Sequence, residues 1–144
     1  MDNFNPEDFN GDFIEDLEAK SKILEDFVSF VLGISFKEFQ KLRRRFIWEV
    51  VPTDLPGRSV LRGTQAFEAF RKQRATDFYY IYGGYEVETL HVARIPITEH
   101  CLPDIPAFSR GDYAVAHKNF KWALIRSHEE GEMPIGDPIF ISRK

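Results

Sequence analysis

The residues best equipped for chemistry lie near the C-terminal end of the chain. The sequence HEEGE places one histidine beside three carboxylates, at His128, Glu129, Glu130 and Glu132. A zinc site needs three or four ligands that converge on one point, and an HExxH motif would place two histidines on one face of a helix. HEEGE supplies a single histidine, and Gly131 disfavours a helix. The sequence therefore indicates the end of a strand followed by a solvated acidic turn.

The other histidines and the single cysteine give no stronger signal. His91 and His117 each lie among apolar residues of a predicted strand, which is typical of a structural histidine. His100 and Cys101 are adjacent, and the segment offers no third residue to orient the imidazole as a base for the thiol. We expect neither catalysis nor a cofactor. A small metal-dependent hydrolase, in which one of these histidines joins His128 and the glutamate after it, remains the first alternative.

A run of three arginines, Arg43 to Arg45 in KLRRRF, could form a basic face. Nucleic-acid-binding domains are usually basic overall, whereas this chain has a net charge of −4. The composition therefore disfavours nucleic-acid binding. A nucleic-acid-binding regulatory module that uses these arginines remains the second alternative.

Length and composition favour one domain, residues 1–144. A chain of this length buries roughly 68% of the surface that its unfolded form exposes, which supports a core without cross-links. No apolar run approaches the ~20 residues of a membrane span, and the N-terminus lacks the apolar region of a signal peptide. With one cysteine, no internal disulfide forms. We expect a cytoplasmic protein without membrane association, as a monomer or homodimer.

Charge is unevenly distributed along the chain. Residues 1–32 carry nine acidic and two basic side chains, and residues 35–49 carry five basic and two acidic ones. An acidic helix lying beside a basic one would explain this asymmetry. We favour this internal pairing, and an interaction surface is the alternative.

The first half of the sequence, residues 1–76, is mainly helical. Apolar residues recur at three- and four-residue spacing over residues 12–32, which predicts a helix capped at Asp12 and ended by Gly33. Ser35 and Glu38 form a capping box for a second helix that runs to Pro52. Thr64 caps a short third helix. The apolar stripe of the first helix consists of Phe13, Ile14, Leu17, Leu24, Phe27, Val28 and Val31.

The second half, residues 77–144, has the two-residue period of strands. Gly83 and Gly84 indicate a hairpin turn, and Lys118 with Asn119 indicates a second one. We expect α+β architecture, in which a helical hairpin and the short third helix cover one face of a mostly antiparallel sheet of about five strands. The expected strands are residues 78–82, 86–97, 112–119, 120–128 and 138–144, and the loop at 52–63 has room for one short strand at 59–61.

Two segments of this second half resemble a known group of proteins. The sequence DYAVAHKNFKWALIRSHE, residues 112–129, preceded by FYYIYGGYEVETLHVARIP, resembles the closing hairpins of small bacterial domains, several of which are similar to immunity proteins. The resemblance covers residues 78–130. It implies an antitoxin without catalytic residues that blocks a cognate bacterial toxin, such as a nuclease. Acidic surfaces would then meet the toxin, with partner contacts at Glu129, Glu130, Glu132, Asp137 and Tyr85.

Overall fold

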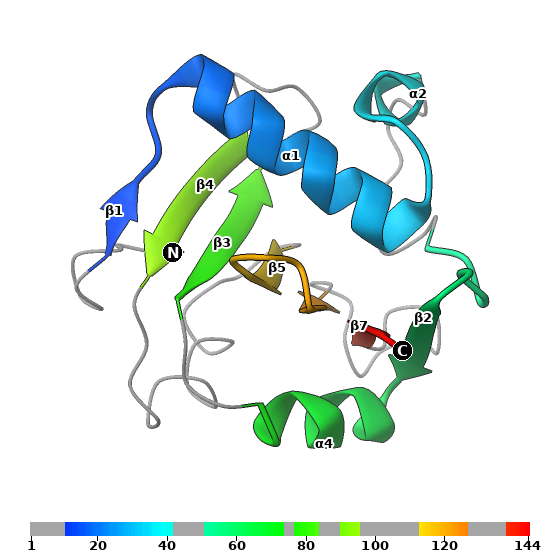
Figure 1. Ribbon diagram of the computed structural model, residues 1–144. Helices are drawn as coiled ribbons and strands as arrows, with labels where there is room; N and C mark the ends of the chain where they lie inside the picture. Colours follow the sequence, from blue (N-terminus) through cyan, green and yellow to red (C-terminus); the bar gives the residue numbers. More distant parts are fainter. Residues whose placement is uncertain (1–10, 42–50, 74–76, 84–89, 96–112, 127–137) are drawn as a thin grey trace.

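The computed structural model describes residues 11–41, 51–73, 77–83, 90–95, 113–126 and 138–144. Within these residues one seven-stranded sheet has the order β1-β4-β3-β5-β6-β7-β2, and every neighbouring pair is antiparallel. The prediction of an α+β fold is confirmed, with seven strands rather than about five (Figure 1). The strands are β1 (Asp12–Phe13), β2 (Arg58–Arg62), β3 (Phe78–Gly83), β4 (Leu90–Ile95), β5 (Tyr113–His117), β6 (Trp122–Arg126) and β7 (Ile139–Arg143).

The two additional strands form the edges of the sheet. β1 pairs with β4 at one edge, and β2 pairs with β7 at the other. β2 contains the short strand expected at residues 59–61 and is one residue longer at each end. β1 was expected inside the first helix, because Phe13 and Leu17 continue the helical spacing of apolar residues. A strand of two residues is too short to show a two-residue period, so its pairing with a distant strand left no local signal.

Helix α1 (Leu17–Leu32) consequently begins later than predicted. Asp16 is its N-cap: the residue is extended, and its carboxylate accepts a hydrogen bond of 2.9 Å from the N–H of Ala19. The predicted cap at Asp12 was wrong. The predicted end is confirmed, because Gly33 has a φ of 74° and its N–H donates to the carbonyl oxygen of Ser29 at 3.0 Å.

Helix α2 (Phe36–Gln40) starts with the capping box that the sequence predicted. The Ser35 hydroxyl accepts a hydrogen bond of 3.1 Å from the N–H of Glu38, whose carboxylate accepts one of 3.3 Å from the N–H of Ser35. The prediction that this helix runs to Pro52 was wrong, because α2 ends at Gln40 with Lys41 as its C-cap. Residues 42–50 lie outside the described residues. The third helix, α4 (Thr64–Arg71), is preceded by Gly63 as its N-cap in place of the predicted Thr64.

Replacing the cap residue gives a first testable prediction. Ser35→Ala removes the acceptor for the N–H of Glu38, and such losses cost about 1 kcal/mol of unfolding free energy. Ser35→Asn keeps an acceptor at the same place and is expected to stay close to the wild type. Urea unfolding of both variants measures the difference, and equal stability of Ser35→Ala and the wild type would refute the role of the cap.

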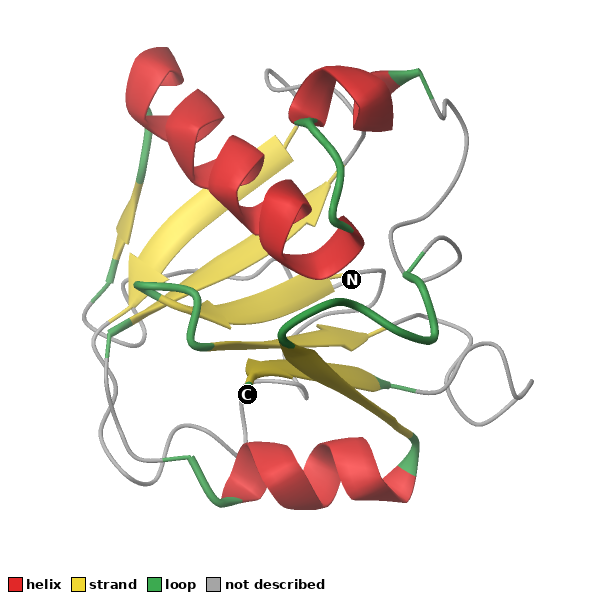
Figure 2. Ribbon diagram, turned by 45° about the vertical axis from the view of Figure 1, so that its right-hand side comes forward, coloured by secondary structure: helices red, strands yellow, loops and turns green. Residues whose placement is uncertain are grey.

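Helices lie on both faces of the sheet, which corrects the expectation that they cover one face (Figure 2). α1 and α2 pack on one face, where side chains such as Ile81, Val92 and Ile125 are buried. α4 packs on the other face with Phe78, Tyr80 and Leu124, among others. Successive side chains of a strand point to opposite faces of the sheet. Because apolar residues occupy both odd and even positions of the central strands, each face must be covered by a helix.

The face that α4 covers is rich in aromatic side chains. The Trp122 ring lies 5.6 Å from that of Phe70 on α4 and 6.1 Å from that of Phe140 on β7, measured between centroids. Phe120 precedes Trp122 by two residues, yet its side chain belongs to the cluster under α1. The reason is its φ of 53°, the single positive φ of a non-glycine residue in the described chain, which reverses the side-chain direction in the β5–β6 turn.

None of the helices in the described ranges is long and apolar enough to cross a membrane.

Candidate partner-binding surface

Most residues that the sequence singled out for function lie outside the described part of the chain. This holds for the partner contacts at Glu129, Glu130, Glu132, Asp137 and Tyr85, and for His128, His100, Cys101 and the three arginines at 43–45. The backbone of His91 lies in β4, but its side chain is outside the described atoms. These assignments therefore stay predictions.

His117 is the one candidate histidine whose side chain is placed. It ends β5 and is 8% exposed. Its ring meets that of Trp122 edge-on at 6.1 Å, and its Nδ1 accepts a hydrogen bond of 3.0 Å from the N–H of Asn119. That bond requires Nδ1 to be unprotonated. Among the described residues, no three His, Cys, Asp or Glu side chains gather as metal ligands. The geometry accordingly gives His117 a structural role in the β5–β6 turn.

The surroundings of His117 disfavour its charged form. Burial lowers the pKa of the imidazole below its ordinary value of 6.5, and the positive charges of Lys121 and Lys118 lower it further. The unfolded chain therefore binds a proton first as the pH falls. Stability that is fully present above pH ~6.5 should be lost as the pH falls from there through the lower pKa of the folded state.

This pH dependence is the second testable prediction. His117→Gln cannot titrate, so the difference in unfolding free energy between the wild type and this variant should shrink when the pH falls from 7.5 to 5.0. The other histidines and the carboxylates are present in both proteins, so the difference isolates His117. Urea unfolding at both pH values measures it. A difference that is the same at both pH values would contradict the account.

A different group of side chains forms an exposed surface where β1 leads into α1. Phe13 is 43% exposed and Leu17 is 54% exposed, and these are the two large apolar side chains that are exposed in the described residues. Four exposed carboxylates surround them in the sequence. We call this group the acidic–apolar surface; it consists of Asp12, Phe13, Glu15, Asp16, Leu17 and Glu18.

The backbone beneath the acidic–apolar surface is firmly attached to the sheet. Phe13 lies opposite Ala93 of β4, and the N–H of Ile14 donates to the carbonyl oxygen of Val92 at 2.9 Å. Gly11 is buried so tightly that a Cβ atom there would lie 2.7 Å from the carbonyl oxygen of Arg94. The surface is thus presented by an ordered edge of the sheet and the first turn of α1.

The acidic–apolar surface also carries a concentrated negative charge. Asp12, Glu15 and Glu18 form no ion pair in the described part of the chain. Arg94, the cross-strand neighbour of Asp12, is ion-paired to Asp77, which raises the pKa of the guanidinium. The positive end of the α1 dipole stabilises Asp16 and Glu18 without removing their charge from the surface.

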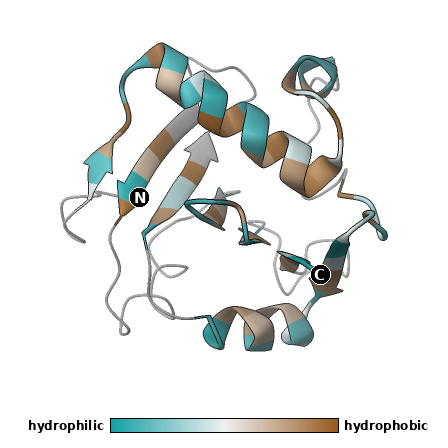
Figure 3. Cartoon of the chain, viewed as in Figure 1, coloured by the Kyte–Doolittle hydropathy of each residue, from teal (hydrophilic) through white to brown (hydrophobic). Residues whose placement is uncertain are grey.

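Sequence reasoning identified the acidity of this segment but placed its apolar residues wrongly. Phe13 and Leu17 were assigned to the buried stripe of the first helix, because their spacing continues that of Leu24 and Phe27. The buried apolar positions of α1 begin further along the helix, at Leu24. Figure 3 shows hydrophilic and hydrophobic bands following one another along this helix. The late cap at Asp16 leaves Phe13 outside the helix and Leu17 at its first position, away from the core.

No protein-family model, curated protein or solved structure matches this chain. The acidic–apolar surface is therefore the described feature on which a functional assignment rests.

Proposed function

We propose that this protein is an immunity protein that neutralises a basic bacterial toxin by binding it through the acidic–apolar surface. One observation carries the proposal: Phe13 and Leu17 are exposed among four exposed carboxylates within seven consecutive residues. A large apolar side chain that stays exposed on an ordered edge is a natural anchor for a protein partner. The resemblance of residues 78–130 to immunity-protein-like domains points the same way.

The chemistry of the surface suits a partner that normally binds phosphate. A nuclease attracts its substrate with basic side chains, and carboxylates spaced along a strand and a helical turn offer those side chains an alternative anion. Long-range attraction between opposite charges speeds the encounter and selects the orientation. Burial of the two apolar side chains then supplies affinity at roughly 25 cal/mol per Å² of apolar surface.

The proposal assigns no catalytic step to the chain. Blocking an active site requires a surface of matching shape and charge, which a rigid sheet edge can provide. Further partner contacts stay proposed at Glu129, Glu130, Glu132, Asp137 and Tyr85, in two segments outside the described residues.

Copurification with the product of the neighbouring gene tests the proposal. Tagged wild-type chain should retain that product, and a Glu15→Lys/Glu18→Lys variant should lose it. Asp16 is left intact because it caps α1. The matched control is Glu25→Lys/Glu68→Lys, which makes the same change of charge at exposed positions of α1 and α4. Equal retention by both double variants would argue against this surface, and no retention by the wild type would argue against the function.

A further inference from the structure

A second charged surface extends from the C-terminal end of α1, at the β2 edge of the sheet, to the β5–β6 turn. Arg58 begins β2 and stands directly opposite Arg143, near the end of β7. The N–H of Arg143 donates to the carbonyl oxygen of Lys121 at 3.1 Å, which brings the β5–β6 turn beside the end of β7. We call this group the basic surface; it consists of Arg58, Lys118, Lys121 and Arg143.

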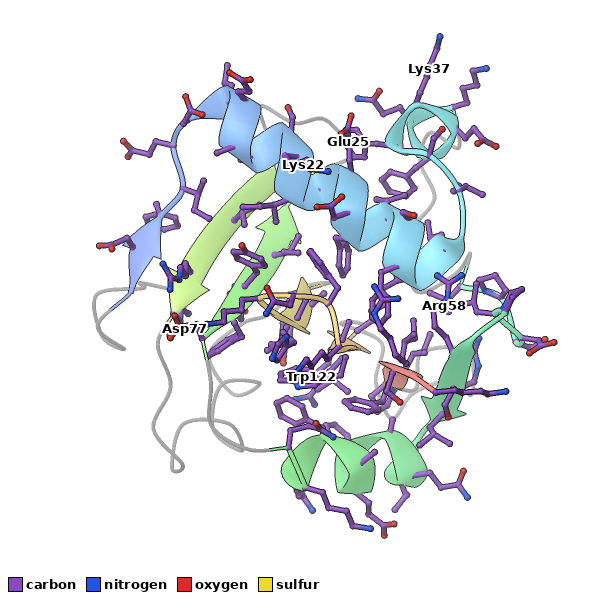
Figure 4. The ribbon with its side chains drawn as sticks, viewed as in Figure 1. Lys22, Glu25, Lys37, Arg58, Asp77 and Trp122 are labelled. Carbon is purple, nitrogen blue, oxygen red and sulfur yellow. The ribbon has the colours of Figure 1, made fainter. Side chains whose placement is uncertain are left out.

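Both guanidinium groups of the basic surface are held in place by the backbone. Arg58 donates from Nη1 to the carbonyl oxygens of Ser29, at 2.9 Å, and Phe30, and from Nε to that of Pro56 at 3.2 Å. It thereby caps the C-terminal end of α1 (Figure 4). Arg143 donates from Nε to the carbonyl oxygen of Phe120 at 2.9 Å, and its guanidinium carbon lies 4.8 Å from the centre of the Phe30 ring.

These four cations form no ion pair in the described part of the chain. Asp77, whose carbonyl oxygen accepts a hydrogen bond of 3.3 Å from the N–H of Lys118, has its carboxylate paired with Arg94. The terminal Nη atoms of Arg143 have no acceptor there either, although Nε fixes the plane of the group. Lys118 and Lys121 are exposed, and both act on His117 by lowering its pKa. Two like charges directly opposite each other on paired strands are unfavourable. An anion bound between them would offset that repulsion.

We propose that the basic surface binds the phosphate groups of a nucleic-acid backbone. Arg143, whose guanidinium is held by its Nε, presents its terminal N–H groups in the fork that matches phosphate oxygens. Arg58 uses Nε and Nη1 for backbone carbonyl oxygens and contributes mainly its charge, and the lysines add mobile point charges. An acidic protein is the less suitable partner. Protein interfaces need apolar anchors, and the two exposed large apolar side chains of the described chain lie at the other edge of the sheet. Nucleic-acid interfaces are polar and positively charged.

The net charge of −4 is compatible with this proposal, because the fold separates the acidic and basic side chains. It averages over the acidic–apolar surface, at the N-terminal end of α1, and the basic surface, which runs from the C-terminal end of α1 to the β5–β6 turn. Because β1 and β2 are the two edges of the sheet, one surface can be occupied while the other stays free. The inference is therefore independent of the proposed immunity function.

Fluorescence anisotropy with a labelled 20-nucleotide single-stranded RNA of mixed sequence tests the proposal. Three or four phosphate contacts predict that log K falls with log[salt] at a slope of about −2 to −3. Lys118→Glu/Lys121→Glu should weaken binding at least tenfold and reduce the slope by about 1.4. Both lysines are exposed and make no described side-chain hydrogen bond, so the fold should persist. The matched control, Lys37→Glu/Lys72→Glu, changes the charge equally at exposed helix ends elsewhere and should bind within twofold of the wild type.

Three results would overturn the proposal. The first is an RNA affinity that the two double variants lose equally, because the attraction would then not be local. The second is binding of inorganic phosphate, followed through the NMR signals of the β5–β6 turn, without binding of the RNA. The third is binding of poly-glutamate as tight as that of RNA of equal charge, which would mark a surface for acidic proteins.

Discussion

Phe27→Ala is expected to lower the free energy of unfolding by about 3–5 kcal/mol, the range for large aromatic truncations in a core. Phe27 is fully buried where α1 crosses the sheet, and its ring centroid lies 6.4 Å from that of Phe120. Phe120 is in turn 6.2 Å from Phe30 and 5.9 Å from Tyr79. Truncation leaves a cavity at the contact between helix and sheet, which neighbours held by strand pairing cannot fill.

Leu17→Ala on the same helix is the matched control. Like Phe27→Ala, it truncates a large apolar side chain of α1 to alanine. Leu17 is 54% exposed, so the change in unfolding free energy should be within about 0.5 kcal/mol. Urea unfolding followed by circular dichroism measures both variants. Similar losses for Phe27→Ala and Leu17→Ala would mean that α1 is placed on the sheet with the wrong face inward.

A triple variant, Glu15→Lys/Leu17→Ala/Glu18→Lys, is expected to weaken the complex with the proposed toxin about 100-fold or more. It removes one proposed apolar anchor and reverses two charges, and a combined loss of about 3 kcal/mol corresponds to roughly 100-fold. None of the three residues lies in the core, so stability should change little. The charge reversals should act mainly on the association rate and its salt dependence, and the loss of Leu17 on the dissociation rate.

Calorimetric titration of the purified partner measures this effect, with Glu25→Lys/Glu68→Lys as the control of equal charge. Figure 4 shows Glu25 further along α1, beside Lys22 and away from β1. An unchanged dissociation constant for the triple variant would move the interface elsewhere. The proposed contacts at Glu129, Glu130, Glu132 and Asp137 would then be the next positions to reverse.

The sequence correctly predicted the structural features that residues close together in the chain determine. The capping box at Ser35 and Glu38, the helix end at Gly33 and the hairpin around Lys118 and Asn119 were all predicted and are all present. Each depends on contacts within a few residues, such as the αL conformation that glycine adopts readily. The strands β3 to β7 were predicted for the same reason, because an alternating period is a local property.

Features that depend on contacts between distant parts of the chain could not be predicted from the sequence. β1 exists because Asp12 and Phe13 pair with β4, some 80 residues later. The exposure of Phe13 and Leu17 follows from that pairing, so the apolar half of the candidate site was missed. The basic surface joins positions 58, 118, 121 and 143, which no motif connects. The placement of α4 opposite α1 depended on the topology of the whole sheet.

A growth assay tests the central claim most directly. The chain is co-expressed in bacteria with the gene next to its own, whose product should be toxic when expressed alone. We expect the wild type and the control variant Glu25→Lys/Glu68→Lys to restore growth. The triple variant Glu15→Lys/Leu17→Ala/Glu18→Lys, present at the same level, should not restore it. Failure of the wild type to protect against a toxic neighbour would contradict the immunity function. Protection by all three proteins would contradict the role of the acidic–apolar surface.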